Sequence, residues 1–198
     1  MFTGIIEATG QIEKLEKEQN NLHLWCSCPF TSELKIDQSL AHNGICLTVV
    51  EIKNNQYRVT AIRETLDKTN LGQLQTGSKI NLERCMPANG RFDGHIVQGH
   101  IDQTARCVER REENGSWLFT FEYDARGGNI TVEKGSITVN GVSLTVVNSQ
   151  ANKFSVCIIP YTYEHTNFGQ LKENDLVNLE FDIVGKYVAR LLKKESRV

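Results

Sequence analysis

The stretch Asn43–Val50, with the sequence NGICLTVV, decides the fold because it occurs twice. It returns 97 residues later as Asn140–Val147, with the sequence NGVSLTVV. Two other pairs keep the same offset: Thr69–Leu74 with Thr166–Leu171, and Asn81–Glu83 with Asn178–Glu180. A register kept over this length indicates an internal duplication, and its unit is the size of a small domain. Two similar domains predict two similar binding surfaces.

Composition narrows the class of protein. The 198 residues fit two domains of roughly 90–100 residues each, and 39% hydrophobic with 23% charged residues is typical of a soluble globular chain. A net charge of −2 gives no support for nucleic acid or acidic membranes as partners. No apolar run approaches the roughly 20 residues that span a bilayer, and the first residues do not resemble a signal peptide. We therefore expect a cytoplasmic protein with six reduced cysteines.

Most of the pattern predicts strands. A hairpin is expected from Ile45–Ile52, a turn at Lys53–Asn55, and Tyr57–Ile62, because β-branched and alternating residues flank a polar turn. The same hairpin is expected again from Ile137–Val147, a turn near Gln150–Asn152, and Phe154–Ile159. Leu22–Cys28 and Trp117–Tyr123 form another pair of equivalent strands. Closely spaced short strands favour small barrels or sandwiches, and barrel closure removes exposed strand edges.

Helix is scarce in the expected structure. Short helical turns are predicted near Glu64–Lys68 and Tyr163–His165, and one longer helix over Gly185–Glu195. That helix carries an apolar stripe, namely Tyr187, Val188, Leu191 and Leu192, opposite Lys186, Arg190 and Lys194. The stripe either covers a barrel or packs against copies of itself, and we favour the second. The expected units are residues 1–95, 96–184 and a C-terminal oligomerisation helix at 185–198.

Familiar catalytic and metal motifs are absent, so no metal site is predicted. His95 and His100 are five residues apart, which is wrong for a helical metal pair, and on a strand they would face opposite ways. Ordinary hydrogen-bonded histidines are the simpler interpretation. Cys46 with Thr48, and Ser143 with Thr145, each alternate onto one strand face and can offer thiol and hydroxyl groups to a polar heterocycle. A ligand-binding β-protein is one interpretation, and a plain turn followed by a strand is the other.

Several motifs together resemble the riboflavin synthase family from Met1 to the C-terminal helix. They are Met1–Glu7, the two duplicated segments beginning at Asn43 and Asn140, Glu64–Leu66, Thr69–Gly72, the GHxxxGH pattern at Gly94–His100, and Lys134–Ser136. The resemblance implies an all-β chain of two tandem Greek-key six-stranded β-barrels followed by a C-terminal α-helix. It also implies a homotrimer, and it leaves association with lumazine synthase open.

The resemblance implies a defined reaction. Two molecules of 6,7-dimethyl-8-ribityllumazine become one riboflavin and one 5-amino-6-ribitylaminouracil by transfer of a four-carbon unit, without a metal or redox cofactor. This is a transferase reaction and the last step of riboflavin biosynthesis. The site lies between the N-terminal barrel of one subunit and the C-terminal barrel of its neighbour. The alternative is a non-catalytic lumazine- or flavin-binding antenna protein of the same fold, and retention of both duplicated motifs and Gly99-His100 favours the enzyme.

The resemblance also implies the substrate-binding residues. For the N-terminal pocket they are Cys46, Leu47, Thr48, Thr60, Ala61, Ile62, Arg63, Glu64 and Thr65. For the C-terminal pocket they are Gly4, Ile5, Ile6, Ser143, Leu144, Thr145, Cys157, Ile158, Ile159, Pro160, Tyr161 and Thr162. Gly99, His100 and Ile101 are expected to line the junction, and Lys134 to reach the ligand of the neighbouring subunit.

Catalytic roles are expected for His100, Cys46, Ser143 and Asp182. We expect His100 to transfer protons and Asp182 to be a weaker acid–base candidate. Asn140 is a departure from some family members, which carry an Asp there with an assigned catalytic role. An amide cannot act as a base, so the role of Asn140 must be hydrogen bonding, and proton transfer falls to His100 or water.

Overall fold

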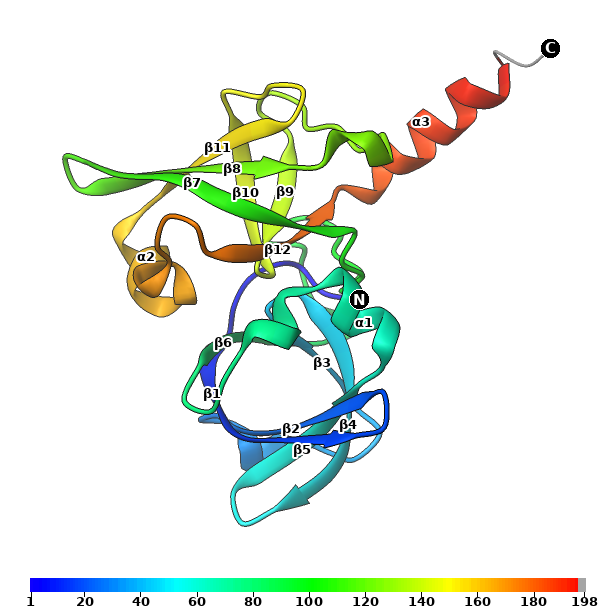
Figure 1. The fold of residues 1–198 in the computed structure, drawn as a ribbon, viewed down its shortest axis with the longest axis vertical. Helices are drawn as coiled ribbons and strands as arrows, with labels where there is room; N and C mark the ends of the chain where they lie inside the picture. Colours follow the sequence, from blue (N-terminus) through cyan, green and yellow to red (C-terminus); the bar gives the residue numbers. More distant parts are fainter. Residues whose placement is uncertain (196–198) are drawn as a thin grey trace.

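Two closed, six-stranded antiparallel barrels lie one on the other, and a C-terminal helix projects from the second (Figure 1). The computed structural model describes the backbone of residues 1–195 and the side chains of residues 1–192. Residues 196–198 of the expected C-terminal unit, and the side chain of Lys194, lie outside the described residues. The predicted all-β class with two barrels and a C-terminal helix is confirmed.

The N-terminal barrel has the strand order β1-β2-β5-β4-β3-β6, and pairing of β1 with β6 closes it. Its strands are β1 (Ala8–Glu18), β2 (Asn21–Ser27), β3 (Ser39–His42), β4 (Ile45–Lys53), β5 (Gln56–Ala61) and β6 (Lys79–Arg84). A short helix, α1 (Arg63–Lys68), and two 3₁₀ turns, η1 (Thr31–Glu33) and η2 (Asn70–Gln73), connect them.

The C-terminal barrel repeats this order as β7-β8-β11-β10-β9-β12. Its strands are β7 (Gln103–Glu113), β8 (Ser116–Tyr123), β9 (Ser136–Val139), β10 (Val142–Val147), β11 (Lys153–Ile158) and β12 (Leu176–Phe181). The connections include η3 (Ala125–Gly127), α2 (Pro160–His165) and η4 (Asn167–Gln170). The expected strands at Leu22–Cys28 and Trp117–Tyr123, and both expected helical turns, are confirmed by β2, β8, α1 and α2.

The prediction of a single strand over Ile137–Val147 is wrong. The run Ile137–Val147 is itself a hairpin, β9 and β10, because the chain reverses at Asn140-Gly141. Both turn residues have positive φ, 47° and 80°, as the two-residue type I′ turn requires. The equivalent turn at Asn43-Gly44, with φ of 48° and 81°, joins β3 to β4. The duplicated motif therefore begins with the turn and continues as the second strand of a hairpin.

Each barrel has a hydrophobic core of its own. The N-terminal core is mostly aliphatic around a fully buried Tyr57, whereas the C-terminal core gathers Phe119, Phe121, Phe154 and Phe168. Full burial of one such side chain contributes roughly 1.5–3 kcal/mol.

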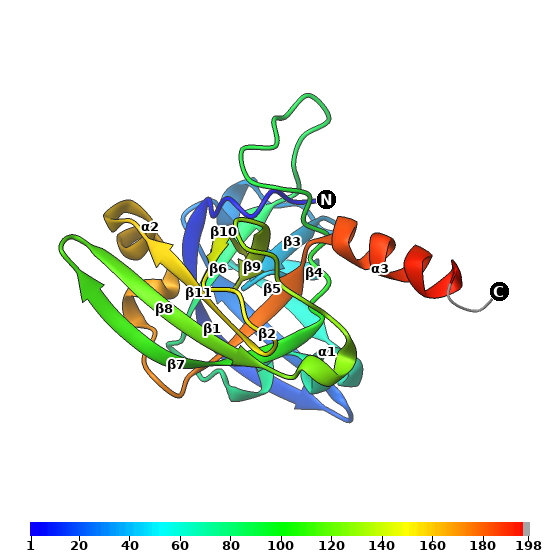
Figure 2. The ribbon, with the colours of Figure 1, turned by 90° about the horizontal axis from the view of Figure 1, so that it is seen from above.

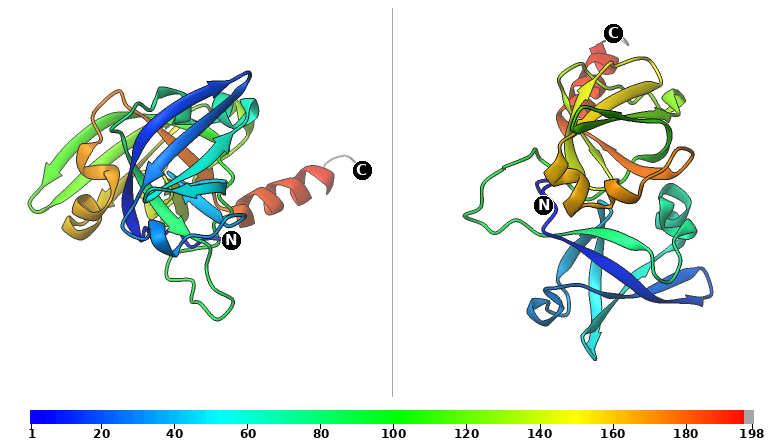
Figure 3. Two further views of the ribbon diagram at one scale, coloured as in Figure 1. Left: turned by 90° about the horizontal axis from the view of Figure 1, so that it is seen from below. Right: turned by 90° about the vertical axis from the view of Figure 1, so that its left-hand side faces the viewer.

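The segments that precede the two barrels, residues 1–7 and 96–102, each pack against the barrel of the other repeat, and we call them the exchanged segments. Ile6, just before β1, packs against the C-terminal core, and Ile101, just before β7, packs against the N-terminal core. Phe2 and Val97 pair with each other as an isolated bridge between these segments. In the right-hand view of Figure 3 the N-terminus accordingly lies at the junction of the barrels. Each barrel is completed by residues that belong, by sequence, to the other repeat.

Helix α3 (Ile183–Glu195) runs away from both barrels (Figure 2). Its stripe residues Tyr187, Val188 and Leu191 are 68%, 50% and 64% exposed. An ion pair of 2.6 Å from Lys186 Nζ to Asp102 Oδ2 fixes the start of the helix. The stripe therefore does not cover a barrel of its own chain. In the described part of the chain no helix is both long and apolar enough to cross a membrane.

Candidate functional site

The first residues of the duplicated strands β4 and β10 pair with only one neighbouring strand. Residues 45–48 of β4 pair with β3, but pairing of β4 with β5 begins only at Val49. Residues 142–145 of β10 likewise pair with β9, and pairing with β11 begins only at Val146. Each barrel thus has a break in strand pairing beside its duplicated strand, and we call this break the gap. We call the gap surface around Cys46–Thr48 the N-terminal site and that around Ser143–Thr145 the C-terminal site.

Alternate residues of each gap strand turn their main-chain groups into the gap. His42 and Ile45 flank a two-residue hairpin turn and so form a hydrogen-bonded pair, after which bonded and non-bonded pairs alternate. Cys46 and Thr48 therefore turn their N–H and C=O groups away from β3. The same alternation applies to Ser143 and Thr145 against β9. A strand edge of this kind offers donors and acceptors to a flat polar ligand.

The exchanged segments occupy the inner end of each gap. The Cys46 N–H donates to the carbonyl of Gly99 at 2.9 Å, and the Ser143 N–H donates to the carbonyl of Gly4 at 2.8 Å. Thr48 and Thr145, two residues further on, are exposed. The structure thus brings Gly4 to Ser143 and Gly99 to Cys46.

His95 forms the closest side-chain pair at the C-terminal site. Its Nδ1 lies 2.7 Å from Ser143 Oγ. Burial lowers the pKa of His95 below its ordinary value, and the negative charge of Asp182 opposes that shift. The ring is therefore neutral near pH 7 and able to accept a proton. This pair was missed because contact between residues 48 positions apart leaves no local pattern.

His100 and Asp182 lie differently from His95. The His100 side chain is exposed, and its main-chain N–H donates to Glu180 Oε2 at 2.9 Å. Asp182 accepts the Val184 N–H at 3.0 Å at the beginning of α3, and its charge reaches His95. Burial raises the pKa of the Cys46 thiol, so that thiol stays protonated at neutral pH. The proton-transfer role of His100 stays a prediction.

Exposure divides the expected site residues into three groups. The exposed residues are Ile5, Thr48, Ile62, Arg63, Glu64, His100, Lys134, Thr145, Cys157, Ile159, Pro160 and Tyr161. The half-buried residues are Ile6, Cys46, Thr60, Thr65, Ile101, Ser143, Leu144, Thr162 and Asp182. Gly4, Leu47, Ala61, Gly99 and Ile158 are buried, so little beyond their main chain is accessible to a ligand. The exposed isoleucines stand out, since Ile62 and Ile159 occupy equivalent positions and are 54% and 59% exposed.

Some expected residues have partners outside the gaps. Arg63 pairs with Asp67 and Glu64 with Lys68 along the surface of α1. The ring of Tyr161 stacks on His165, with centroids 4.1 Å apart. Lys134, at φ 64°, lies in the connection between β8 and β9. Among the described residues no three His, Cys, Asp or Glu side chains are grouped so that they could hold a metal ion.

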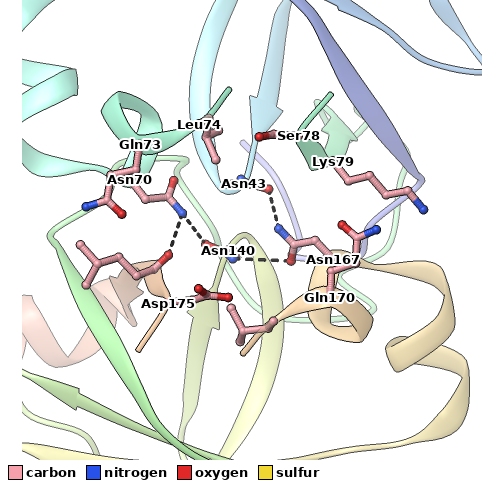
Figure 4. A pocket seen from close by; sticks show the side chains of 12 residues that line it. Asn43, Asn70, Gln73, Leu74, Ser78, Lys79, Asn140, Asn167, Gln170 and Asp175 are labelled. Carbon is pink, nitrogen blue, oxygen red and sulfur yellow. Dashed lines mark hydrogen bonds between the residues drawn. The ribbon is translucent and has the colours of Figure 1, made fainter. Parts of the chain in front are cut away.

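Asparagines from both repeats join the barrels at their junction (Figure 4). Asn178 Oδ1 accepts the Asn70 N–H, and Asn81 Oδ1 accepts the Asn167 N–H, both at 2.7 Å. A polar cavity of about 270 Å³ lies beside them. These asparagines belong to the duplicated motifs, so their recurrence was visible in the sequence although their contact was not. They fix the two sites relative to one another within one chain.

Asn140 belongs to this junction. It is 3% exposed, and its Oδ1 accepts the Asn178 N–H at 2.9 Å. Its neighbour Gly141 meets Gly44 of the other repeat backbone to backbone. A hydrogen-bonding role, as expected from its amide, agrees with this position.

Comparison with known proteins shows a match to both repeats. The family model described as the lumazine binding domain matches residues 3–85 and again residues 98–182. The riboflavin synthase of Actinobacillus pleuropneumoniae is 42% identical over 98% of this chain and 91% of its own. That of Bacillus subtilis is also 42% identical, over 99% of this chain and 92% of its own, and that of Mycobacterium tuberculosis is 41% identical over 98% of each.

Solved structures confirm the fold. LumP complexed with riboflavin matches with a TM-score of 0.84 at 24% identity, over 91% of this chain and 99% of that chain. LumP complexed with 6,7-dimethyl-8-(1'-D-ribityl) lumazine matches with a TM-score of 0.81 at 22% identity, with the same coverage. At this level of identity the likeness concerns the fold alone.

Proposed function

Because this chain belongs to the riboflavin synthase family, we propose that its N-terminal and C-terminal sites each bind one 6,7-dimethyl-8-ribityllumazine. The observation that carries this proposal is the duplicated gap, in which the main chain of Thr48 and of Thr145 faces away from the paired strands β3 and β9. The exposed Ile62 and Ile159 add an apolar surface beside each gap. A flat heterocycle with donors and acceptors along one edge fits both features.

The proposed reaction depends chiefly on positioning. Transfer of a four-carbon unit between two identical molecules requires that they face each other, and holding both converts a bimolecular step into an effectively unimolecular one. The substrate carries an acidic methyl group, so the protein must move protons. The neutral His95, 2.7 Å from Ser143, is suited to this at the C-terminal site, and His100 lies where the exchanged segment meets the N-terminal site.

We also propose that the two facing sites come from different subunits of a homotrimer. Helix α3 leaves its apolar stripe exposed, and a groove of about 640 Å³ lies between α3 and residues 127–136. Lys134 belongs to that same connection, from which it would reach the neighbour's ligand. We further propose a cytoplasmic location, and lumazine synthase is the protein partner to test first, by co-sedimentation.

One assay tests the proposed function. Purified protein given 6,7-dimethyl-8-ribityllumazine alone should form riboflavin and 5-amino-6-ribitylaminouracil in equal amounts, measured by chromatography. The Thr48→Val/Thr145→Val double variant is the matched control and should form little of either. An antenna protein would instead copurify with a stoichiometric fluorescent ligand and form no product. Binding without turnover, or product ratios far from one to one, would contradict the proposal.

A further inference from the structure

Two buried glutamates hold the exchanged segments. Glu83, in β6 of the N-terminal barrel, accepts the Thr3 N–H at 2.6 Å, the Thr3 hydroxyl at 2.8 Å and the Gly4 N–H at 3.0 Å. Its side chain is buried. The carboxylate therefore fixes the main chain of Thr3 and Gly4 from the side of the N-terminal barrel.

Glu180 does the same in the other barrel. This β12 residue accepts the N–H groups of Gln98, Gly99 and His100 at 2.7, 2.9 and 2.9 Å. It is 2% exposed. Glu83 and Glu180 are equivalent positions of the duplicated NLE motif, so the two repeats share one device.

The segments held in this way form part of the opposite barrel's site. Gly4, held by Glu83, accepts the N–H of Ser143, and Gly99, held by Glu180, accepts the N–H of Cys46. The contacts leave no room for side chains: a Cβ at Gly4 would lie 2.6 Å from Ser143 Cβ, and one at Gly99 would lie 2.7 Å from Cys46 Cβ. A small movement of either segment must therefore move the gap strand that it touches.

We infer that Glu83 and Glu180 are positioning residues that act across the barrel boundary. Glu83 of the N-terminal barrel sets the geometry of the C-terminal site, and Glu180 of the C-terminal barrel sets that of the N-terminal site. This inference rests on the proposed function, because it assigns to each glutamate the lumazine-type ligand of the opposite barrel.

The carboxylate itself is required by the donor pattern. Both oxygens of each glutamate accept hydrogen bonds, and a carboxylate is an acceptor only. Glutamine would place an NH₂ group against a main-chain N–H at one of these positions. The held segment must then shift, while the volume of the side chain is almost unchanged.

The test uses backgrounds in which one site is weakened. Thr48→Val weakens the N-terminal site, so the C-terminal site then has the higher affinity for the ligand. Thr145→Val weakens the C-terminal site, so the N-terminal site then has the higher affinity. Riboflavin is the probe, and calorimetric titration of the full chain measures its affinity. Glu83→Gln should weaken riboflavin binding about tenfold in the Thr48→Val background and less than about twofold in the Thr145→Val background, since a lost hydrogen bond of about 1.4 kcal/mol is a factor of ten. Glu180→Gln should show the reverse pattern.

The controls separate positioning from general damage. Glu112→Gln, at an exposed position of β7, should leave both backgrounds unchanged. If a glutamine variant fails to fold, the corresponding aspartate variant, Glu83→Asp or Glu180→Asp, replaces it with the same expected crossed pattern. Loss of binding in the variant's own barrel, or equal loss in both backgrounds, would overturn the inference. An unsubstituted protein that bound no riboflavin would overturn the proposed function as well.

Discussion

Cys46 and Ser143 occupy equivalent positions, but their surroundings differ. Ser143 has His95 at hydrogen-bond distance, whereas burial raises the pKa of the Cys46 thiol. The two sites therefore share a shape and differ in their capacity for proton transfer. A dismutation needs this difference, because one substrate molecule gives the four-carbon unit and the other receives it.

The first prediction concerns His95. Glutamine at this position keeps a hydrogen-bonding group near Ser143 and removes the base. We expect His95→Gln to lower kcat by roughly 10²–10⁴-fold with a much smaller change in KM, the range typical of general acid–base catalysis. Because burial lowers the pKa of His95, the acid limb of kcat/KM in the unsubstituted enzyme should lie below pH 6.5.

Steady-state rates across pH check this prediction. His100→Gln is the matched comparison, since it changes the other histidine of the GHxxxGH pattern. If His95→Gln keeps kcat within twofold and its acid limb is unchanged, His95 is not the proton-transfer group, and that role falls to His100.

The second prediction concerns His42 and stability. His42 is fully buried, with Nε2 3.0 Å from the Tyr57 hydroxyl, and burial lowers its pKa to about 4. Between pH 6.5 and 4 the unfolded chain binds a proton at this residue and the native chain does not. The free energy of unfolding therefore decreases as the pH is lowered through this range. The loss should reach roughly 3 kcal/mol by pH 4, at about 1.4 kcal/mol per pH unit.

Urea unfolding measured from pH 7 to pH 4 tests this expectation. In a Trp117→Phe background, Trp25 reports on the N-terminal barrel. His42→Gln should be less stable at pH 7 and should depend less on pH, whereas His165→Gln, at an exposed residue, should keep the original slope. The same slope for His42→Gln as for the background would contradict the assignment.

At the residue scale, the sequence indicates the local parts of the candidate site. Strand alternation and duplication both mark Cys46 with Thr48 and Ser143 with Thr145, and their binding roles stay predictions. The spacing of His95 and His100 favours ordinary hydrogen-bonded histidines, and it does not reveal that the partner of His95 is Ser143 on a distant strand. Glu83 and Glu180 were seen only as part of a repeat, because the sequence does not show which main-chain donors a buried carboxylate will meet.

At the scale of elements, regular strands were easier to predict than short ones. The β4–β5 hairpin has enough alternation and a clear polar turn. β3 and β9 are four residues each, which is too short for a periodicity, so the sequence pattern predicts β9 and β10 as one run. The Asn140-Gly141 turn was the available signal against that reading.

The third prediction concerns α3. Its exposed stripe, Tyr187, Val188, Leu191 and Leu192, should be buried when subunits associate. Truncation after Gly185 should give monomers that still bind riboflavin but turn over poorly, and Leu191→Glu should weaken assembly in the same direction. Light scattering coupled to size-exclusion chromatography measures the mass.

A charge change outside the helix provides the control for α3. Lys172→Glu, at an exposed position, should leave the mass unchanged. An unaltered trimer after truncation would show that the stripe does not hold the subunits together, and the sites would then have to meet in another way.

At the scale of the whole molecule, the exchanged segments and the asparagine junction make the two barrels one unit. Asn81 Nδ2 donates to the Asn140 carbonyl at 2.9 Å, and Asn178 Nδ2 donates to the Asn43 carbonyl at 3.0 Å. This near-symmetry follows from the duplication, which the sequence shows plainly. The exchange itself was not predictable by periodicity, because either barrel offers a hydrophobic surface to Ile6 or Ile101.

A site of one chain should work with the opposite site of its neighbour, and mixing two variants tests this most directly. Thr48→Val damages the N-terminal site and Thr145→Val the C-terminal site, and each alone should lower activity roughly five- to 150-fold, as for loss of 1–3 kcal/mol. Subunit exchange is verified first by mass spectrometry, and riboflavin formation is then measured. We predict that the mixture recovers part of the activity, because some interfaces pair an intact N-terminal site with an intact C-terminal site. Verified exchange with no recovered activity would contradict the claim.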